Sequence, residues 1–163
     1  MKRYLPFVLL LISISLFAQE GKKAPDFSLE NLDGDPVTLS ENTGAGPVLL
    51  SFWATWCKPC IEELPHLEKI YADLKGKGLK IFAISVDGEK TAAKVEPFAK
   101  TKGMEIPVLL DPNGDVARAF YAKDVPHTVL LNAAGEIVYT HSGFKLGDEI
   151  QLREKITALL EGK

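Results

Sequence analysis

The junction between an apolar segment and the chain's two cysteines constrains the fold more than any other feature of the sequence. Residues 48–53 (Val-Leu-Leu-Ser-Phe-Trp) are almost entirely apolar, which is typical of a strand buried on both faces of a central sheet. Cys57 and Cys60 follow, and across residues 58–75 the apolar side chains recur at helical spacing, which predicts a helix with one apolar face. Pro65 inside this helix removes one backbone hydrogen bond and should produce a kink.

Strands and helices alternate along the rest of the chain. After a flexible lead at 21–25, we predict a hairpin at 27–39, strands at 79–86, 107–110, 128–132 and 136–141, and helices at 90–102, 115–121 and 146–160. This order predicts an α/β fold in which helices cover both faces of a mixed sheet, with the last two strands antiparallel. The length of 163 residues suits a single domain.

A secretory signal peptide is predicted at the N-terminus. Lys2 and Arg3 precede an apolar run at residues 4–17, which ends abruptly in a polar segment. We place cleavage after Ala18, so residues 1–18 are the signal and residues 19–163 the domain. A membrane-spanning helix needs about 20 residues, so an N-terminal membrane anchor is the weaker alternative. The sequence therefore predicts a periplasmic or other extracytoplasmic protein that is soluble after cleavage.

The position of the cysteines predicts redox chemistry. A thiol at the N-terminus of a helix faces unpaired amides and the positive end of the helix dipole, which lower its pKa below the free value of about 8.5. Lys58 adds a neighbouring positive charge, and Pro59 fits the first turn of a helix. We expect Cys57 to be the exposed nucleophile and Cys60 to resolve the mixed disulfide by forming a Cys57–Cys60 bridge.

Two other interpretations of the cysteine pair remain open. A zinc site would need two further ligands, and the three histidines, His66, His127 and His141, are scattered along the chain. A structural disulfide across a two-residue gap closes almost no loop and would add little stability. We expect neither a metal nor another cofactor, and the absence of a basic patch argues against nucleic acid as a partner.

The segment 51–60 (Ser-Phe-Trp-Ala-Thr-Trp-Cys-Lys-Pro-Cys) resembles the active site of the thioredoxin superfamily. More narrowly, Ala-Pro-Asp-Phe-Ser-Leu at 24–29, Phe-Trp-Ala-Thr-Trp-Cys at 52–57 and Glu-Leu-Pro at 63–65 resemble the exported proteins related to ResA and TlpA, which carry an AhpC/TSA-Redoxin-like domain. The resemblance covers nearly all of residues 24–160. It implies a thioredoxin-like fold with an N-terminal β-hairpin extension and a central α-β insertion. It also implies protein-disulfide oxidoreductase activity.

The resemblance also suggests roles for residues around the cysteines. Val125-Pro126 would form a cis peptide bond, with Val125 offering its backbone to a partner peptide; an ordinary trans proline is the alternative. Glu63, one turn beyond Cys60, would accept or relay the Cys60 proton, unless it is a solvated surface acid. Trp56 would supply an apolar contact surface for peptides.

Two residues depart from the family pattern. Thioredoxin itself carries a buried aspartate at the position of Ser51, and because serine cannot act as a base near neutral pH, we interpret Ser51 as a small core residue. His127 stands where a small hydroxyl residue is more usual. A protonated His127 near the cysteines would stabilise the Cys57 thiolate, but we favour a partly exposed histidine at the start of a strand.

The leading functional hypothesis is thiol–disulfide exchange with protein cysteines outside the cytoplasm. The resemblance suggests reductive work, for example on apocytochrome c, with electrons from a membrane thiol donor of the DsbD/CcdA type. One alternative is a peroxidase of the peroxiredoxin type, although Ser51, Phe52 and Trp53 replace the proline region expected there. A second alternative is a non-enzymatic binding module, against which the presence of both cysteines argues.

Overall fold

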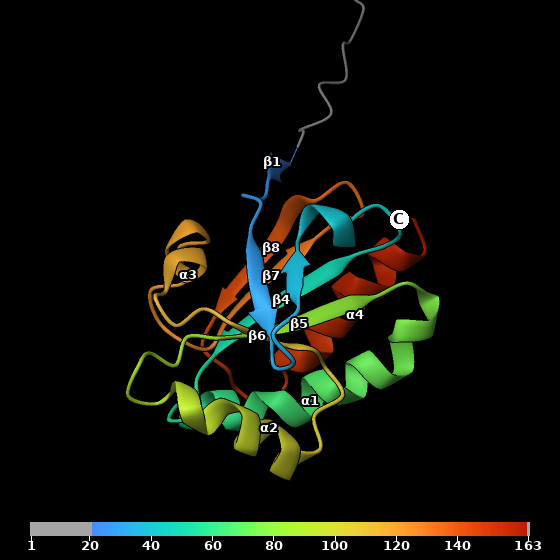
Figure 1. The fold of residues 1–163 in the computed structure, drawn as a ribbon. Helices are drawn as coiled ribbons and strands as arrows, with labels where there is room; N and C mark the ends of the chain where they lie inside the picture. The colour runs from blue at the N-terminus through green and yellow to red at the C-terminus, as the bar shows by residue number, and fades with distance from the viewer. Residues whose placement is uncertain (1–20, 163) are drawn as a thin grey trace, which may run out of the picture.

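β4 (Val48–Trp53) runs through the middle of a mixed sheet of eight strands within residues 21–162, the part of the chain that the computed structural model describes. The predicted signal peptide at residues 1–18 lies outside the described residues. The strand order is β1-β8-β7-β4-β5-β6-β2-β3 (Figure 1). The other strands are β1 (Lys22–Lys23), β2 (Ser28–Asn31), β3 (Pro36–Thr38), β5 (Lys80–Ser85), β6 (Val108–Leu110), β7 (His127–Leu131) and β8 (Glu136–Ser142).

β4 is buried on both faces, as its apolar sequence predicts, because strands flank it on either side and helices lie above and below it. It pairs in parallel with β5 and antiparallel with β7. Its side chains alternate between two cores: Leu49 and Trp53 belong to one, and Val48, Leu50 and Phe52 to the other.

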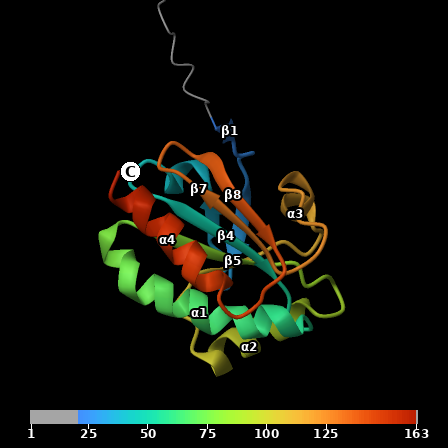
Figure 2. The same cartoon turned by 180° about the vertical axis from the view of Figure 1, so that it is seen from behind.

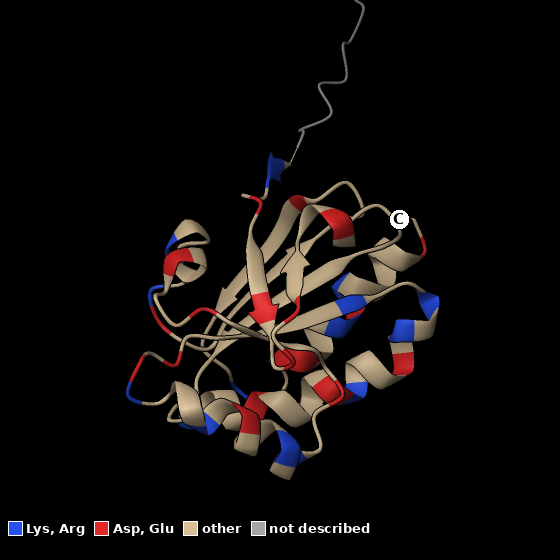
Figure 3. Ribbon diagram, viewed as in Figure 1, with Lys and Arg blue, Asp and Glu red and all other residues tan. Residues whose placement is uncertain are grey.

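The helices divide between the two faces of the sheet. Side chains of α1 (Lys58–Leu74), α2 (Val95–Lys102) and α4 (Asp148–Leu160) pack in the core of Leu49 and Trp53, and Figure 2 shows α1 and α4 crossing this face. The short α3 (Asp115–Ala119) packs in the opposite core. The predicted mixed sheet with helices on both faces is confirmed. Acidic and basic residues are interspersed along α1 and α2 (Figure 3).

Several predicted boundaries are wrong, for identifiable reasons. Residues 22–23, predicted as a flexible lead, form β1 by pairing with β8. The closing helix begins at Asp148 rather than at residue 146, because Gly147 has a φ of 106°, outside the helical region. The helix predicted at 90–102 is α-helical only from Val95, after a 3₁₀ turn.

Within residues 21–162, no helix combines the length and the apolar character that a membrane-spanning segment requires.

Candidate active site

The two cysteines form a disulfide at the first turn of α1, with their Sγ atoms 2.06 Å apart. Cys57 is the N-cap residue with an extended backbone, and the Cys60 N–H donates a hydrogen bond to the Cys57 Sγ at 3.3 Å. Pro59 occupies the first turn, as predicted. The end of β4 and the apolar face of α1 are both fixed in the core, so they hold the intervening turn, and the Cys57 Sγ, at the helix N-terminus.

The prediction that Cys57 is exposed is wrong for the disulfide form. Cys57 is only 5% exposed and Cys60 is fully buried. Cys57 is thus the outer cysteine of the pair, as predicted, but the difference in exposure between the two is small. Bonding to Cys60 holds the Cys57 sulfur against the protein, 3.5 Å from the carbonyl oxygen of Val125. Lys58 and Pro59 are exposed beside it.

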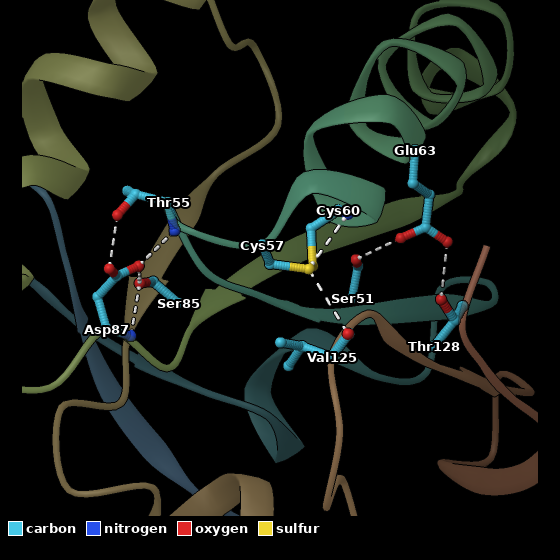
Figure 4. Close-up of a disulfide and its surroundings, with 9 residues drawn as sticks. All are labelled: Ser51, Thr55, Cys57, Cys60, Glu63, Ser85, Asp87, Val125 and Thr128. Carbon is cyan, nitrogen blue, oxygen red and sulfur yellow. Dashed lines mark hydrogen bonds between the residues drawn. A yellow bond between two sulfur atoms is a disulfide. The ribbon is translucent and has the colours of Figure 1, made fainter.

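A cis peptide bond between Val125 and Pro126 faces the cysteine pair, as the resemblance implied. Figure 4 shows the Val125 carbonyl directed at the Cys57 sulfur. The Gly143 N–H donates to the Pro126 carbonyl at 2.8 Å and anchors the loop. Among the described residues, the Val125 N–H has no hydrogen-bond partner, so this backbone donor is free to pair with another chain.

Glu63 is a buried acid, 4% exposed, on the inner face of α1. Thr128 Oγ1 donates to one carboxylate oxygen at 3.2 Å, and Ser51 Oγ donates to the other at 3.5 Å (Figure 4). Burial raises the pKa of Glu63 to about 7, while these two hydrogen bonds oppose the shift and the charge of Asp148 adds to it. The alternative of a solvated surface acid is therefore excluded for Glu63. No hydrogen bond joins Glu63 to either cysteine within the described part of the chain.

Ser51 is the small core residue that we expected, and in addition its hydroxyl hydrogen-bonds to a buried acid. It is fully buried, and the alternation along β4 points it to the α1 side, where its hydroxyl meets Glu63. The position of the aspartate in thioredoxin is thus occupied by a donor to the acid on α1.

Asp87 was missed by the sequence analysis. Its carboxylate is 2% exposed and accepts hydrogen bonds from the Thr55 N–H at 2.8 Å, the Thr55 hydroxyl at 2.6 Å and the Ser85 hydroxyl at 3.0 Å. These bonds tie the turn before Cys57 to the end of β5 (Figure 4). The sequence did offer a sign of this role, because Asp87 directly follows the strand predicted at 79–86. Neighbouring parallel strands end at the same edge of a sheet, so an acid after this strand lies near the turn that follows the strand at 48–53.

Trp56 projects from the turn and is 62% exposed. Together with Val125, Val86 and Ala117 it lines an open groove of about 470 Å³ between the cysteine turn and α3. This geometry makes Trp56 available for the peptide contact predicted for it.

The interpretation of His127 as a partly exposed residue is wrong. His127 is 7% exposed, its Nδ1 lies 2.7 Å from the Ser142 hydroxyl, and its ring packs near Phe52 in the core on the α3 side. Burial lowers the pKa of His127, which disfavours the imidazolium that could have stabilised a Cys57 thiolate. No group of three or more potential metal-ligating side chains occurs among residues 21–162.

Comparisons with known proteins agree with this arrangement. The AhpC/TSA family model matches residues 20–140. Over 126 residues the chain is 38% identical to the thiol-disulfide oxidoreductase ResA of Halalkalibacterium halodurans, covering 77% of this chain and 70% of that protein. It is 39% identical over 124 residues to ResA of Bacillus subtilis, covering 76% and 68%. A crystal structure from Chlorobium tepidum, assigned as thiol:disulfide interchange protein DsbE, superposes with a TM-score of 0.79 at 33% identity, covering 86% of this chain and 97% of that one.

Proposed function

The chain belongs to the AhpC/TSA family, and we propose that it acts outside the cytoplasm, where its Cys57–Cys60 pair reduces disulfides in other proteins. It is a protein-disulfide oxidoreductase, and its ResA relatives are named thiol-disulfide oxidoreductases. The observation that carries the proposal is the Cys57 sulfur at the N-terminus of α1, facing the cis Val125-Pro126 bond. The apolar N-terminal segment at residues 4–17 supports export.

The reaction begins with the reduced protein. The Cys57 thiolate attacks one sulfur of a partner disulfide, forms a mixed disulfide and releases the other partner sulfur as a thiolate. Cys60 then loses its proton and attacks the Cys57 sulfur, which closes the observed disulfide and releases the second partner thiolate. Both partner thiolates take up protons from solvent, so two electrons pass from the dithiol to the partner.

Glu63 and Val125 have separate roles in this proposal. The Glu63 carboxylate accepts the Cys60 proton during resolution, which is a suitable task for an acid whose pKa burial raises to about 7. The Val125 backbone pairs with the partner segment next to the target cysteine, while Trp56 contacts its apolar side chains. Lys58 favours the thiolate through its charge, and Pro59 fits the first turn of α1, where its missing N–H costs little.

The resemblance to the ResA and TlpA group supports a proposal for the direction and the partners. We propose net reduction of protein cysteines, with apocytochrome c as a substrate and a membrane thiol donor of the DsbD/CcdA type as the electron source. Each of these partners exchanges electrons through cysteine thiols, so the pair needs no further cofactor.

Trapping tests this function. In the Cys60→Ser variant the mixed disulfide cannot resolve, so we expect extracytoplasmic proteins, including cytochrome c precursors, to stay disulfide-linked to Cys57. The Cys57→Ser variant is the matched control and should capture none. Capture of no protein by Cys60→Ser, or rapid peroxide consumption that requires Cys57 alone, would contradict the proposal; the second result would favour the peroxidase.

A further inference from the structure

A small cavity lies behind Glu63, between α1, β8 and the start of α4. Glu63 and Thr128 border it on the inside, and His141 and Asp148 border it on the outside. About 10 Å³ is open to the centre of a water molecule, which is near the minimum needed to hold one water. The cavity therefore offers a buried carboxylate room for a single bridging water.

The outer wall is polar and reaches solvent. His141 Nε2 lies 3.1 Å from an Asp148 carboxylate oxygen, and these side chains are 36% and 33% exposed. The Lys145 N–H donates to the same oxygen at 2.8 Å and fixes the pair. His141 is the cross-strand partner of Thr128, whose hydroxyl donates to Glu63. Polar groups thus line the cavity from the buried acid to the surface.

The remaining titratable groups near the cavity are few. Tyr139 on β8 and Glu149 on α4 also line it, and His66 on α1 lies 3.8 Å from Glu149. Burial raises the pKa of Tyr139, so its hydroxyl stays protonated at neutral pH. His141 lines this cavity with an imidazole, whose two ring nitrogens can accept and donate protons.

We propose that Glu63 exchanges its proton with solvent through this cavity, by way of His141 and Asp148. The inference rests on the proposed function, in which Glu63 takes the Cys60 proton. After the Cys57–Cys60 bond closes, the Glu63 carboxylic acid returns that proton through the bridging water to the His141–Asp148 pair and then to solvent. None of Cys57, Trp56 and Val125 borders the cavity, so a partner bound at those residues uses different contacts from the proton route.

Chemical rescue tests the route in the intact oxidoreductase. We expect His141→Ala to slow steady-state reduction of a protein disulfide at pH 7, with a dithiol reductant in excess, by about three- to tenfold, because Glu63 must lose its proton before it can serve in the next turnover; imidazole added to the buffer should restore the rate. His66→Ala is the matched control, because His66 lies on the same side but outside the cavity lining. It should change neither the rate nor the response to imidazole. An unchanged rate in His141→Ala, or a loss that imidazole does not restore, would overturn the proposal.

Infrared titration of Glu63 in the oxidised protein gives a readout that does not depend on exchange with a partner. Asp148→Asn removes a negative charge that raises the Glu63 pKa, so half-protonation should move to a pH about 0.5 lower. An unchanged titration would contradict the coupling. If the wild-type protein reduced no protein disulfide at all, the proposed function would fail, whereas this titration would still report on the cavity.

Discussion

At the scale of single residues, two buried carboxylates near the cysteine turn, those of Asp87 and Glu63, have different roles. Asp87 accepts three hydrogen bonds that hold the turn before Cys57. Glu63 accepts two weaker ones and has a pKa raised to about 7. Three short hydrogen bonds fix the Asp87 carboxylate against the turn, whereas at Glu63 burial outweighs two longer hydrogen bonds and raises the pKa. Asp87 positions the turn, and Glu63 is suited to gain and lose a proton.

The raised pKa of Glu63 should make stability depend on pH. The ordinary value is 4.5 and the folded value is about 7, so between these pH values the folded protein binds more protons than the unfolded chain. Stability of the oxidised protein is then highest below pH 4.5 with respect to this group, and it falls as pH rises through 7, by at most about 3 kcal/mol.

Glu63→Gln should abolish that pH dependence while keeping a side chain able to hydrogen-bond with Ser51 and Thr128. The measurement is urea unfolding of the oxidised protein at several pH values from 4.5 to 7.5. Glu62→Gln, at the exposed neighbouring position, is the control and should keep the wild-type slope. A Glu63→Gln variant with an unaltered slope would show that Glu63 is not the responsible group.

Asp87→Asn should destabilise the oxidised protein by about 1–3 kcal/mol, because an amide cannot accept from all the donors that Thr55 and Ser85 present. The free energy of unfolding in denaturant measures the loss. Glu89→Gln, two residues away and exposed, should change it by less than about 0.5 kcal/mol. Equal effects in the two variants would mean that Asp87 does not hold the turn.

At the scale of helices and strands, the N-terminus of α1 is the element that prepares the nucleophile. Its free amides and dipole act on the Cys57 sulfur, and the Cys60 N–H already donates to that sulfur in the disulfide form. Lys58 is exposed in the same turn. A carboxylate at position 58 would stabilise the helix through the helix dipole but would disfavour the Cys57 thiolate. A substitution there therefore distinguishes an effect on thiol reactivity from an effect on helix stability.

Lys58→Glu should therefore raise the pKa of the Cys57 thiol and lower the reduction potential by about 10–20 mV, since the dithiol form loses part of its stabilisation. Equilibration with glutathione measures the potential. Lys69→Glu is the control: 11 residues farther along α1 it lies about 16 Å away, beyond the screening length at 0.1 M salt. A potential that rises in Lys58→Glu would contradict the electrostatic role of this turn.

The order of the strands and helices was predictable because it depends on local periodicity. The residues at which several of these elements begin or end were not predictable. Gly147 and Tyr121, with φ values of 106° and 58°, set the start of α4 and the limit of the segment after α3. β1 has two residues, and only its pairing with β8 makes it a strand. Those features are decided by tertiary contacts that periodicity does not report.

The features of the site likewise fall into those that could be predicted from the sequence and those that could not. The roles of Cys57 and Cys60 were predicted from their position after a buried strand and at the start of a helix, and the cis Val125-Pro126 bond was implied by the resemblance to the family. The partners of Glu63 could not be predicted, because Thr128 lies 65 residues away along the chain. The burial of His127 likewise depends on pairing between β7 and its neighbours.

At the scale of the whole molecule, the sheet brings three distant segments to one edge. The cysteine turn follows β4, the Asp87 carboxylate follows β5, and the cis-proline loop precedes β7, which pairs with β4. Because β4 is antiparallel to β7 and parallel to β5, the end of β4 lies beside the start of β7 and the end of β5. The arrangement places the Cys57 sulfur, the Val125 backbone and a fixed turn together at that edge.

Whether Cys57 is the activated nucleophile can be tested by the pH dependence of iodoacetamide alkylation of the reduced protein, with mass spectrometry to identify the modified cysteine. We expect Cys57 to react first, with a midpoint clearly below the pKa of about 8.5 of a free thiol. Preferential alkylation of Cys60, or a Cys57 midpoint at or above 8.5, would contradict this expectation.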